Sequence, residues 1–329
     1  MSAVLSAQTA ESRSSGASPA PAELFIVLNP GSGARPKDEV RQAIEQELSA
    51  AGRRFRYVEV RPGRIVAACQ EAARLARDEN GVVVAAGGDG TINCAAQAAF
   101  THDVPLGVIA QGTFNLFARE HGLALDAAEA TRMLLAAQPE PVQVGWVNQR
   151  LFLVNASVGL YPKLLADREQ VKTRLGRRRW IAMLSALRSL LEWQRQLLLD
   201  VELDGQLKQL RTASVFVCNN RLQLQRIGIG DEIVAQVGEG RLAGLTVRSI
   251  DLWAKLRMVA SALLGRLGDE RAVDSFAMRT LSVGSRRIRR MSVATDGEVL
   301  RMELPLRFTV APRPLKVMLP PVEQRLPPE

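Results

Sequence analysis

The chain has 329 residues, of which 47% are hydrophobic and 23% charged, a globular composition with length enough for two domains. Aromatic residues make up only 5%, which argues against a nucleic-acid reader that works by base stacking. The net charge of +9 leaves open an anionic membrane surface, an anionic ligand, nucleic acid, or a basic protein without any such partner.

Cysteine and histidine are used sparingly. Cys69, Cys94 and Cys218 are far apart and lack CxxC spacing, so neither a disulfide framework nor a zinc site is expected, and a reducing cytoplasm fits best. Only two histidines are present, which argues against a histidine-rich metal centre. No run approaches the roughly 18 apolar residues that a membrane-spanning helix needs, so we expect any membrane contact to be peripheral.

The first half of the chain predicts an α/β domain. Residues 1–21 are rich in Ser, Ala and Pro and predict a disordered leader, and the domain is expected over 22–140. Apolar strands are predicted at 24–28, 54–60, 82–86 and 104–110, with helices at 37–51, 64–79 and 91–100. Strands that are apolar throughout and alternate with helices predict a parallel, Rossmann-like sheet covered on both faces. Such sheets bind ligands at the carboxyl ends of their strands.

The pattern changes near residue 140. Residues 141–304 contain short alternating strands with turns at Asn148-Gln149 and Asp204-Gly205, which predict a mostly antiparallel β-sandwich. A long amphipathic helix over 168–199 is expected to interrupt it. The C-terminal segment 305–322 is expected to pack back onto the first domain.

Three loops follow three apolar strands and carry the polar residues of a candidate site. They are Asn29–Gly33, Gly87–Asn93 and Gly112–Asn115. Glycines let backbone N–H groups approach a phosphate, and a following helix N-terminus favours an anion. Asp89 fits beside a phosphate if Mg²⁺ lies between them or if it binds a hydroxyl. Ordinary turns without a ligand are the alternative; P-loop and GxGxxG signatures are absent.

Four motifs in this order resemble the diacylglycerol kinase catalytic family, which includes bacterial lipid kinases and the sphingosine kinases. The motifs are NPGSG (29–33), GGDGTIN (87–93), GTFNLFAR (112–119) and DGE (296–298), and the resemblance covers roughly residues 23 to 320. It implies a nucleotide-binding α/β domain, a β-sandwich domain, and ATP-dependent phosphorylation of a lipid hydroxyl, such as that of diacylglycerol or sphingosine.

The resemblance also implies roles for individual residues. Asp89 would hold Mg²⁺ beside the phosphates, Glu298 would be the general base, and Asp296 would support it on a tight turn that presents both carboxylates to one cleft. Without the other motifs, residues 296–298 would be read as a solvated hairpin turn. The residues expected to bind ATP are Asn29, Pro30, Gly31, Ser32, Gly33, Gly87, Gly88, Asp89, Gly90, Thr91, Asn93, Gly112 and Thr113.

Three positions depart from the family pattern. Leu116 stands where many members have an acidic residue after Asn115, and Cys94 stands where a Glu often follows Asn93. Glu239 in QVGEGRL is the nearest match to an acidic metal-binding loop of the family's β-domain, so it is a second candidate metal ligand. These departures leave open a weaker or differently specific enzyme.

Two basic segments bear on a membrane partner. The predicted helix 168–199 has an apolar stripe behind a cluster of arginines, and SRRIRR (285–290) adds a second patch just before the expected base. This pattern favours an anionic membrane surface, although a helix packed on its own domain would look similar. The family resemblance implies a lipid substrate, nucleic acid is not expected, and exposed β-edges would allow a homodimer.

Three functions remain open from sequence. An ATP-dependent lipid kinase fits all four motifs. A soluble NAD kinase-like or sugar-type kinase would share GGDGT but not NPGSG, GTFN or DGE. A nucleotide-binding regulator or nucleic-acid binder without catalysis would account for Leu116 and for the charge, but not for the retained Asp89, Thr91 and Glu298.

Overall fold

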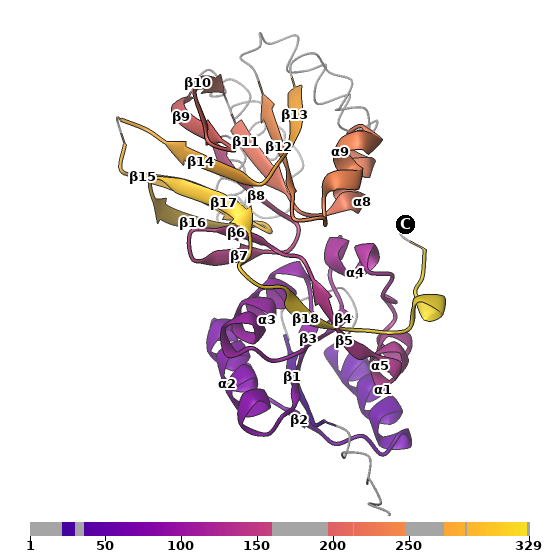
Figure 1. Cartoon of the computed structure of the whole chain (residues 1–329). Helices are drawn as coiled ribbons and strands as arrows, with labels where there is room; N and C mark the ends of the chain where they lie inside the picture. The colour runs from indigo at the N-terminus through magenta and orange to yellow at the C-terminus, as the bar shows by residue number, and fades with distance from the viewer. Residues whose placement is uncertain are drawn as a thin grey trace, which may run out of the picture.

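The computed structural model describes residues 22–29, 36–159, 197–212, 214–247, 273–286 and 288–327. It has an α/β lobe formed mainly by the first half of the chain and a β-rich lobe formed by the second half (Figure 1). The leader 1–21, most of the NPGSG loop (30–35) and the basic segment up to residue 196 lie outside the described residues.

A six-stranded sheet forms the centre of the α/β lobe. In spatial order its strands are β2 (Phe55–Tyr57), β1 (Leu24–Leu28), β3 (Val82–Gly87), β4 (Leu106–Ala110), β18 (Leu315–Leu319) and β5 (Gln138–Val142). All neighbours are parallel except β18 and β5. The strand order reverses between β1 and β3, and a ligand site in such sheets lies at this switch point, beyond the carboxyl ends of the strands.

Helices cover both faces because the strands bury side chains on both sides. Leu24 and Ile26 face a core shared with α1 (Lys37–Ala50) and α5 (Ala127–Ala136). Phe25 and Val27 face α2 (Ile65–Asp78) and α3 (Asp89–His102) on the other side. A short helix, α4 (Leu116–Glu120), follows the third loop.

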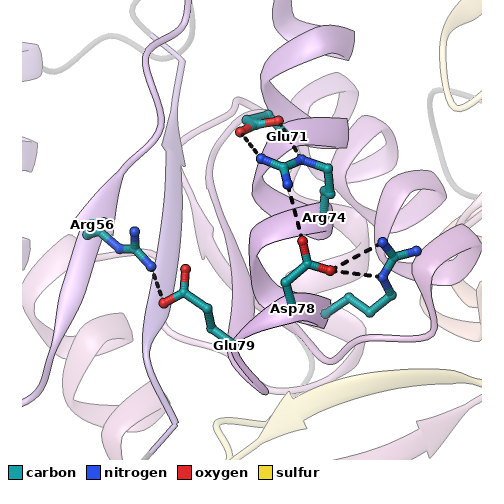
Figure 2. Close-up of polar contacts among 6 residues, drawn as sticks. Arg56, Glu71, Arg74, Asp78 and Glu79 are labelled. Carbon is teal, nitrogen blue, oxygen red and sulfur yellow. Dashed lines mark hydrogen bonds and ion pairs between the residues drawn. The ribbon is translucent and has the colours of Figure 1, made fainter.

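The outer face of α2 is a charged, solvent-facing surface (Figure 2). Arg74 bridges Glu71 and Asp78, with N···O distances of 2.7 and 3.2 Å, while Arg56 of β2 pairs with Glu79. Exposed pairs of this kind contribute little stability each. They show that α2 buries its alanine-rich face and leaves its polar face to water.

The β lobe is a sandwich of two six-stranded antiparallel sheets. One contains β10 (Gln206–Thr212), β9 (Leu197–Leu203), β14 (Thr280–Gly284), β17 (Leu306–Val310), β6 (Gly145–Val147) and β7 (Arg150–Phe152). The other contains β13 (Val273–Met278), β12 (Leu242–Val247), β11 (Ser214–Cys218), β8 (Asn155–Gly159), β15 (Arg290–Thr295) and β16 (Glu298–Glu303). Alternate side chains of both sheets, such as Val201, Val217 and Phe308, form one core.

The predicted fold class is confirmed, with differences at particular elements. Helix α3 begins at Asp89 instead of residue 91, so Asp89 and Gly90 belong to its first turn. The predicted helix 168–199 is wrong at its end, because residues 197–199 pair with 210–212 as strand. Two short helices, α8 (Arg221–Arg226) and α9 (Asp231–Gln236), were not anticipated.

The expected return of segment 305–322 to the α/β lobe is correct only for its second part, because residues 306–310 form β17 of the sandwich and the chain crosses to the α/β lobe after them. Strand β18 completes the central sheet between β4 and β5, and a short 3₁₀ helix (Val322–Gln324) follows it. No helix in the described part of the chain has the length and apolar character needed to cross a membrane.

Candidate functional site

Hydrogen bonds join the loops that follow β1, β3 and β4. Asn29 Nδ2 donates to Thr91 Oγ1 at 2.8 Å, which ties the first loop to the start of α3. Asp89 Oδ2 accepts from the backbone N–H of Asn115 at 3.1 Å, which ties α3 to the third loop. The described parts of the three loops therefore form one structure at the carboxyl edge of the sheet, and Asn29 lies at its switch point.

Asp89 combines burial with an unsatisfied oxygen. Its Oδ1 atom is buried and, within the described structure, has no hydrogen-bond partner. Burial raises the pKa of this carboxyl, while backbone N–H groups including that of Asn115 oppose the rise. A buried polar atom without a partner is costly unless a ligand or ion satisfies it. This oxygen fits a hard cation such as Mg²⁺, or a substrate hydroxyl.

Two glycines are required by close packing around this edge. A Cβ atom on Gly112 would lie 2.7 Å from Asn115 Oδ1 and 3.0 Å from Gly88 Cα. A Cβ atom on Gly87 would lie 2.7 Å from the Thr91 side chain. A side chain at Gly112 would push the third loop away from the second, and one at Gly87 would displace Thr91, which accepts the hydrogen bond from Asn29. The glycines are therefore needed for packing at this edge as well as for access of a phosphate.

Asp296 takes part in one of the links between the two lobes. It sits at a positive φ of 47° in the turn between β15 and β16. Its Oδ2 accepts from Leu153 N (2.7 Å) and Asn93 Nδ2 (2.6 Å), and its Oδ1 accepts from Val154 N and Asn155 N, both at 2.9 Å. Burial raises the pKa of Asp296, and these four donors oppose the rise by favouring the carboxylate. Asp296 is directed inward and organises this junction.

Glu298, two residues later, faces outward. Its side chain is 55% exposed, and Oε2 lies 2.6 Å from Nη2 of Arg150 on β7. The two carboxylates of the DGE turn therefore differ in environment, since Asp296 is held by backbone amides and Glu298 by an arginine. The expectation that both point into one cleft does not describe Asp296.

One stripe of α3 connects the loop edge to the β lobe. Asp89, Asn93 and Gln97 are spaced four residues apart and share a face of the helix. Asp89 contacts the third loop, Asn93 contacts Asp296, and Gln97 Oε1 accepts from Leu151 N at 3.0 Å. Residues 89 and 296, which are 207 positions apart in the chain, thus lie on the same side of the molecule.

The departures from the family pattern have visible consequences. Leu116 begins α4 and packs against the core of the α/β lobe, so it provides no charge. Glu120, one turn later, does not replace that charge at the loop edge. Its carboxylate accepts hydrogen bonds from Asn220 Nδ2 and from Arg221 N at 2.5 and 2.6 Å. Burial raises the pKa of Glu120 to about 7. It joins α4 to the start of α8 and makes a second link between the lobes.

The remaining predicted residues are distributed as follows. Gly88 precedes the first turn of α3, which contains Gly90, and Thr113 is exposed on the third loop. Pro30, Gly31, Ser32 and Gly33 lie outside the described residues. Glu239 is exposed in a turn, and no group of three or more His, Cys, Asp or Glu able to hold a metal occurs where the structure is described. A metal at Glu239 stays a prediction.

Sequence reasoning missed two residues of the candidate site. Arg150 is 148 positions from Glu298, so no local spacing signals their ion pair. Phe114 is 63% exposed although it is a large apolar residue, and it stands between Thr113 and Asn115 of the third loop. An aromatic residue inside a Gly-Thr-x-Asn turn is the signal that would have identified it.

Comparisons with known proteins match both lobes. Residues 23–147 match the model of the diacylglycerol kinase catalytic domain, and residues 162–319 match that of the YegS C-terminal NAD kinase beta sandwich-like domain. A diacylglycerol kinase of Bacillus subtilis (strain 168) is 27% identical over 90% of this chain and 95% of its own length. The "Probable lipid kinase YegS-like" of Klebsiella pneumoniae (strain 342) is 32% identical over 29% of this chain and 33% of its own.

The architecture is shared as well. A crystal structure of a diacylglycerol kinase from Bacillus anthracis superposes with a TM-score of 0.62 at 18% identity and covers 91% of this chain and 97% of that one. In sequence order the chain therefore contains a diacylglycerol kinase catalytic domain and a YegS C-terminal NAD kinase beta sandwich-like domain, and it is homologous to bacterial diacylglycerol kinases and YegS-like lipid kinases.

Proposed function

We propose that this protein is an ATP-dependent lipid kinase that transfers the γ-phosphate of ATP to a lipid hydroxyl. The observation that carries the proposal is the hydrogen bond between Asn93 and Asp296, which joins the loop edge of the sheet to the turn that holds Glu298. One site then contains phosphate-binding loops and an acidic group able to take a proton. Phosphoryl transfer needs mainly this positioning and charge neutralisation.

The loop edge would bind the triphosphate. Backbone N–H groups at the start of α3 and of the Gly112 loop are suited to phosphate oxygens, and the positive end of the helix dipole adds to this. Asp89 Oδ1 would hold Mg²⁺, which neutralises phosphate charge when it is bound. Asn29 and Asn115 would act by positioning Thr91 and Asp89.

Glu298 would act as the general base. The acceptor hydroxyl would lose its proton to Glu298 Oε while its oxygen bonds to the γ-phosphorus, and the bond from that phosphorus to the β–γ bridging oxygen breaks. Exposure on the surface of the turn makes Glu298 accessible to an acceptor. Arg150 would orient the carboxylate before transfer, and Asp296 would fix the turn without touching the acceptor.

The lipid acceptor would be reached from a membrane surface. The predicted basic helix lies outside the described residues, so its contribution stays a prediction. We infer peripheral contact with an anionic membrane from the composition and the two arginine-rich segments.

The test is transfer of labelled phosphate from ATP to a panel of acceptors. Diacylglycerol, sphingosine, ceramide and phosphatidylglycerol are presented in mixed micelles, with NAD in a parallel reaction. Asp89→Asn and Glu298→Gln are each expected to lower kcat by at least about 10²-fold, the size typical of a lost general base or charge-stabilising group. Glu45→Gln is the matched control, because Glu45 is also exposed and pairs with an arginine, Arg41, at 2.7 Å.

Each outcome bears on the proposal. A labelled lipid whose formation depends on Asp89 and Glu298 supports it. Labelled NAD would assign a soluble small-molecule kinase, and ATP binding without transfer would assign a regulator. Near-normal activity of Glu298→Gln would remove the assigned base.

A further inference from the structure

A large pocket opens in the β lobe, remote from the loop edge. It has a volume of about 940 Å³ and lies between the β14–β15 connection and the end of the β15–β16 hairpin. It is lined by Asp200, Gly284, Ser285, Arg286, Ile288, Arg289, Arg290, Arg301, Glu303, Leu304 and Pro305.

The pocket has an excess of positive charge. Four guanidinium groups face two carboxylates among its lining residues. Glu303 Oε1 forms an ion pair with Arg290 Nη2 at 2.6 Å, and Asp200 Oδ2 lies 3.7 Å from Arg286 Nε. In the part of the chain that the structure describes, the side chains of Arg289 and Arg301 have neither an ion pair nor a hydrogen bond.

Two unpaired arginines beside two paired ones are suited to an oxyanion. The planar guanidinium matches phosphate with two parallel hydrogen bonds, and Arg is weakly hydrated compared with Lys. Like charges collected in a concave surface also raise the local potential. All four arginines are exposed, so water and salt screen their repulsion, and an anion can reach them. Their convergence in one concave surface is the observation that favours a phosphate-bearing ligand.

Exposed aliphatic side chains lie beside the arginines. Ile288 is 41% exposed in the pocket lining, between Arg286 and Arg289. Leu198 is also 41% exposed and shares a face of β9 with Asp200, because the two are separated by one residue of a strand. Arginines next to exposed aliphatic residues are typical of a surface that contacts phosphate headgroups and the adjoining acyl region.

The SRRIRR part of the pocket is at the opposite end of the hairpin from the expected base, while Arg301 lies three residues from Glu298 on β16, about 10 Å away and on the other face of the strand. Arg290 pairs with Glu303 at one end of β15–β16, and Thr295 pairs with Glu298 at the other. Five residues at 3.4 Å each separate them by about 17 Å. The SRRIRR patch is therefore close to Glu298 in sequence but remote from it in space, so it does not serve the transferring phosphate.

We propose that this arginine pocket binds the phosphate headgroups of anionic phospholipids and anchors the β lobe on a membrane, with Ile288 and Leu198 at the lipid interface. The anchor is separate from the phosphoryl-transfer site. The anchor does not depend on lipid phosphorylation, and vesicle binding is measured without ATP, so a failure of the proposed kinase activity would not affect this test.

The experiment is sedimentation of the full-length protein with vesicles of phosphatidylglycerol and phosphatidylcholine, compared with pure phosphatidylcholine. Each arginine near an anionic surface contributes roughly fivefold to partitioning, so Arg289→Gln with Arg301→Gln is expected to weaken binding on the order of 30-fold. Arg61→Gln with Arg132→Gln is the control, since it removes the same charge from exposed sites on the α/β lobe. Glu303→Gln is expected to strengthen binding, because it releases Arg290.

The results separate the explanations. A loss confined to the pocket variant, with a gain for Glu303→Gln, supports the anchor. Equal losses in pocket and control variants would overturn it in favour of net charge alone. Unchanged vesicle binding, together with inorganic phosphate raising the Tm of the wild type but not of the pocket variant, would overturn it in favour of a small phosphate ligand. Circular dichroism checks that each variant is folded.

Discussion

Replacing Asp296 by asparagine is expected to destabilise the fold strongly, although the change removes a charge and almost no volume. Both oxygens of Asp296 accept two hydrogen bonds each, from Leu153 N and Asn93 Nδ2 on one side and from Val154 N and Asn155 N on the other. Asn has one acceptor oxygen and one NH₂ donor. The better orientation of the amide keeps its oxygen on Val154 N and Asn155 N. Asn93 can then turn its own amide so that its oxygen accepts from the new NH₂, which leaves Leu153 N as the donor that faces a donor.

The magnitude follows from this count. A hydrogen bond to a charged group contributes about 1.5–3 kcal/mol, and a buried donor left unpaired loses its hydration as well. One such bond must be lost in Asp296→Asn, and the remaining bonds no longer involve a charge, so the free energy of unfolding should fall by at least roughly 1.5–3 kcal/mol. A native domain has only about 5–15 kcal/mol in total.

The chain contains a matched control in its other Asp-Gly hairpin. Asp204 and Gly205 have φ values of 45° and 87°, close to the 47° and 87° of Asp296 and Gly297. Asp204 uses only Oδ1, which accepts from Arg279 N and Thr280 N at 3.0 and 2.8 Å in an exposed turn. An asparagine oxygen can keep both bonds, so Asp204→Asn should cost under about 1 kcal/mol.

Urea unfolding followed by circular dichroism compares the two variants with the wild type. Equal, small losses for Asp296→Asn and Asp204→Asn would refute the reasoning, because the turn would then not depend on the carboxylate. A large activity loss for Asp296→Asn without a stability loss would instead give Asp296 a direct chemical role.

Three further predictions concern other sites. Glu120→Gln should remove a pH dependence of stability. Because the pKa of Glu120 is raised to about 7 in the folded state, the folded protein holds this proton more tightly than the unfolded chain does. The free energy of unfolding should therefore fall as the pH rises, by about 2.5 kcal/mol between pH 5 and 8. The urea midpoints of the wild type and of the variant are measured across this pH range and subtracted at each pH. The subtraction cancels the effect of His121, whose pKa is lowered to about 4 by burial. Curves of stability against pH that run parallel for the two proteins would contradict the assignment. Gly112→Ala should weaken ATP binding at least about tenfold in calorimetry, because its Cβ would lie 2.7 Å from Asn115 Oδ1, whereas Gly230→Ala, whose Cβ would have open space, should not. Arg150→Met should lower kcat more than it changes KM for ATP, since Arg150 contacts Glu298 and not the loop edge; an effect on KM alone would place Arg150 with the nucleotide.

The sequence by itself determined the two-lobe architecture and the loop edge. Strands such as 24–28 and 82–86 are apolar at every position, which requires a sheet covered on both faces, and a parallel sheet brings the ends of its strands together. Asp89 and Gly112 were therefore expected to meet, because strand direction and local turn residues are encoded over a few positions.

Only the tertiary structure decided how the acidic hairpin meets this edge. The four donors to Asp296 come from residues 93 and 153–155, and the partner of Glu298 is Arg150, so no local pattern distinguishes the buried carboxylate from the exposed one. The arginine pocket was likewise fixed by strand pairing, which places Arg301 opposite Ser292, diagonal to Arg290, and puts Arg290 about 17 Å along the hairpin from Glu298. Long-range register sets these neighbours, and register depends on the packing of whole sheets, which no short stretch of sequence specifies.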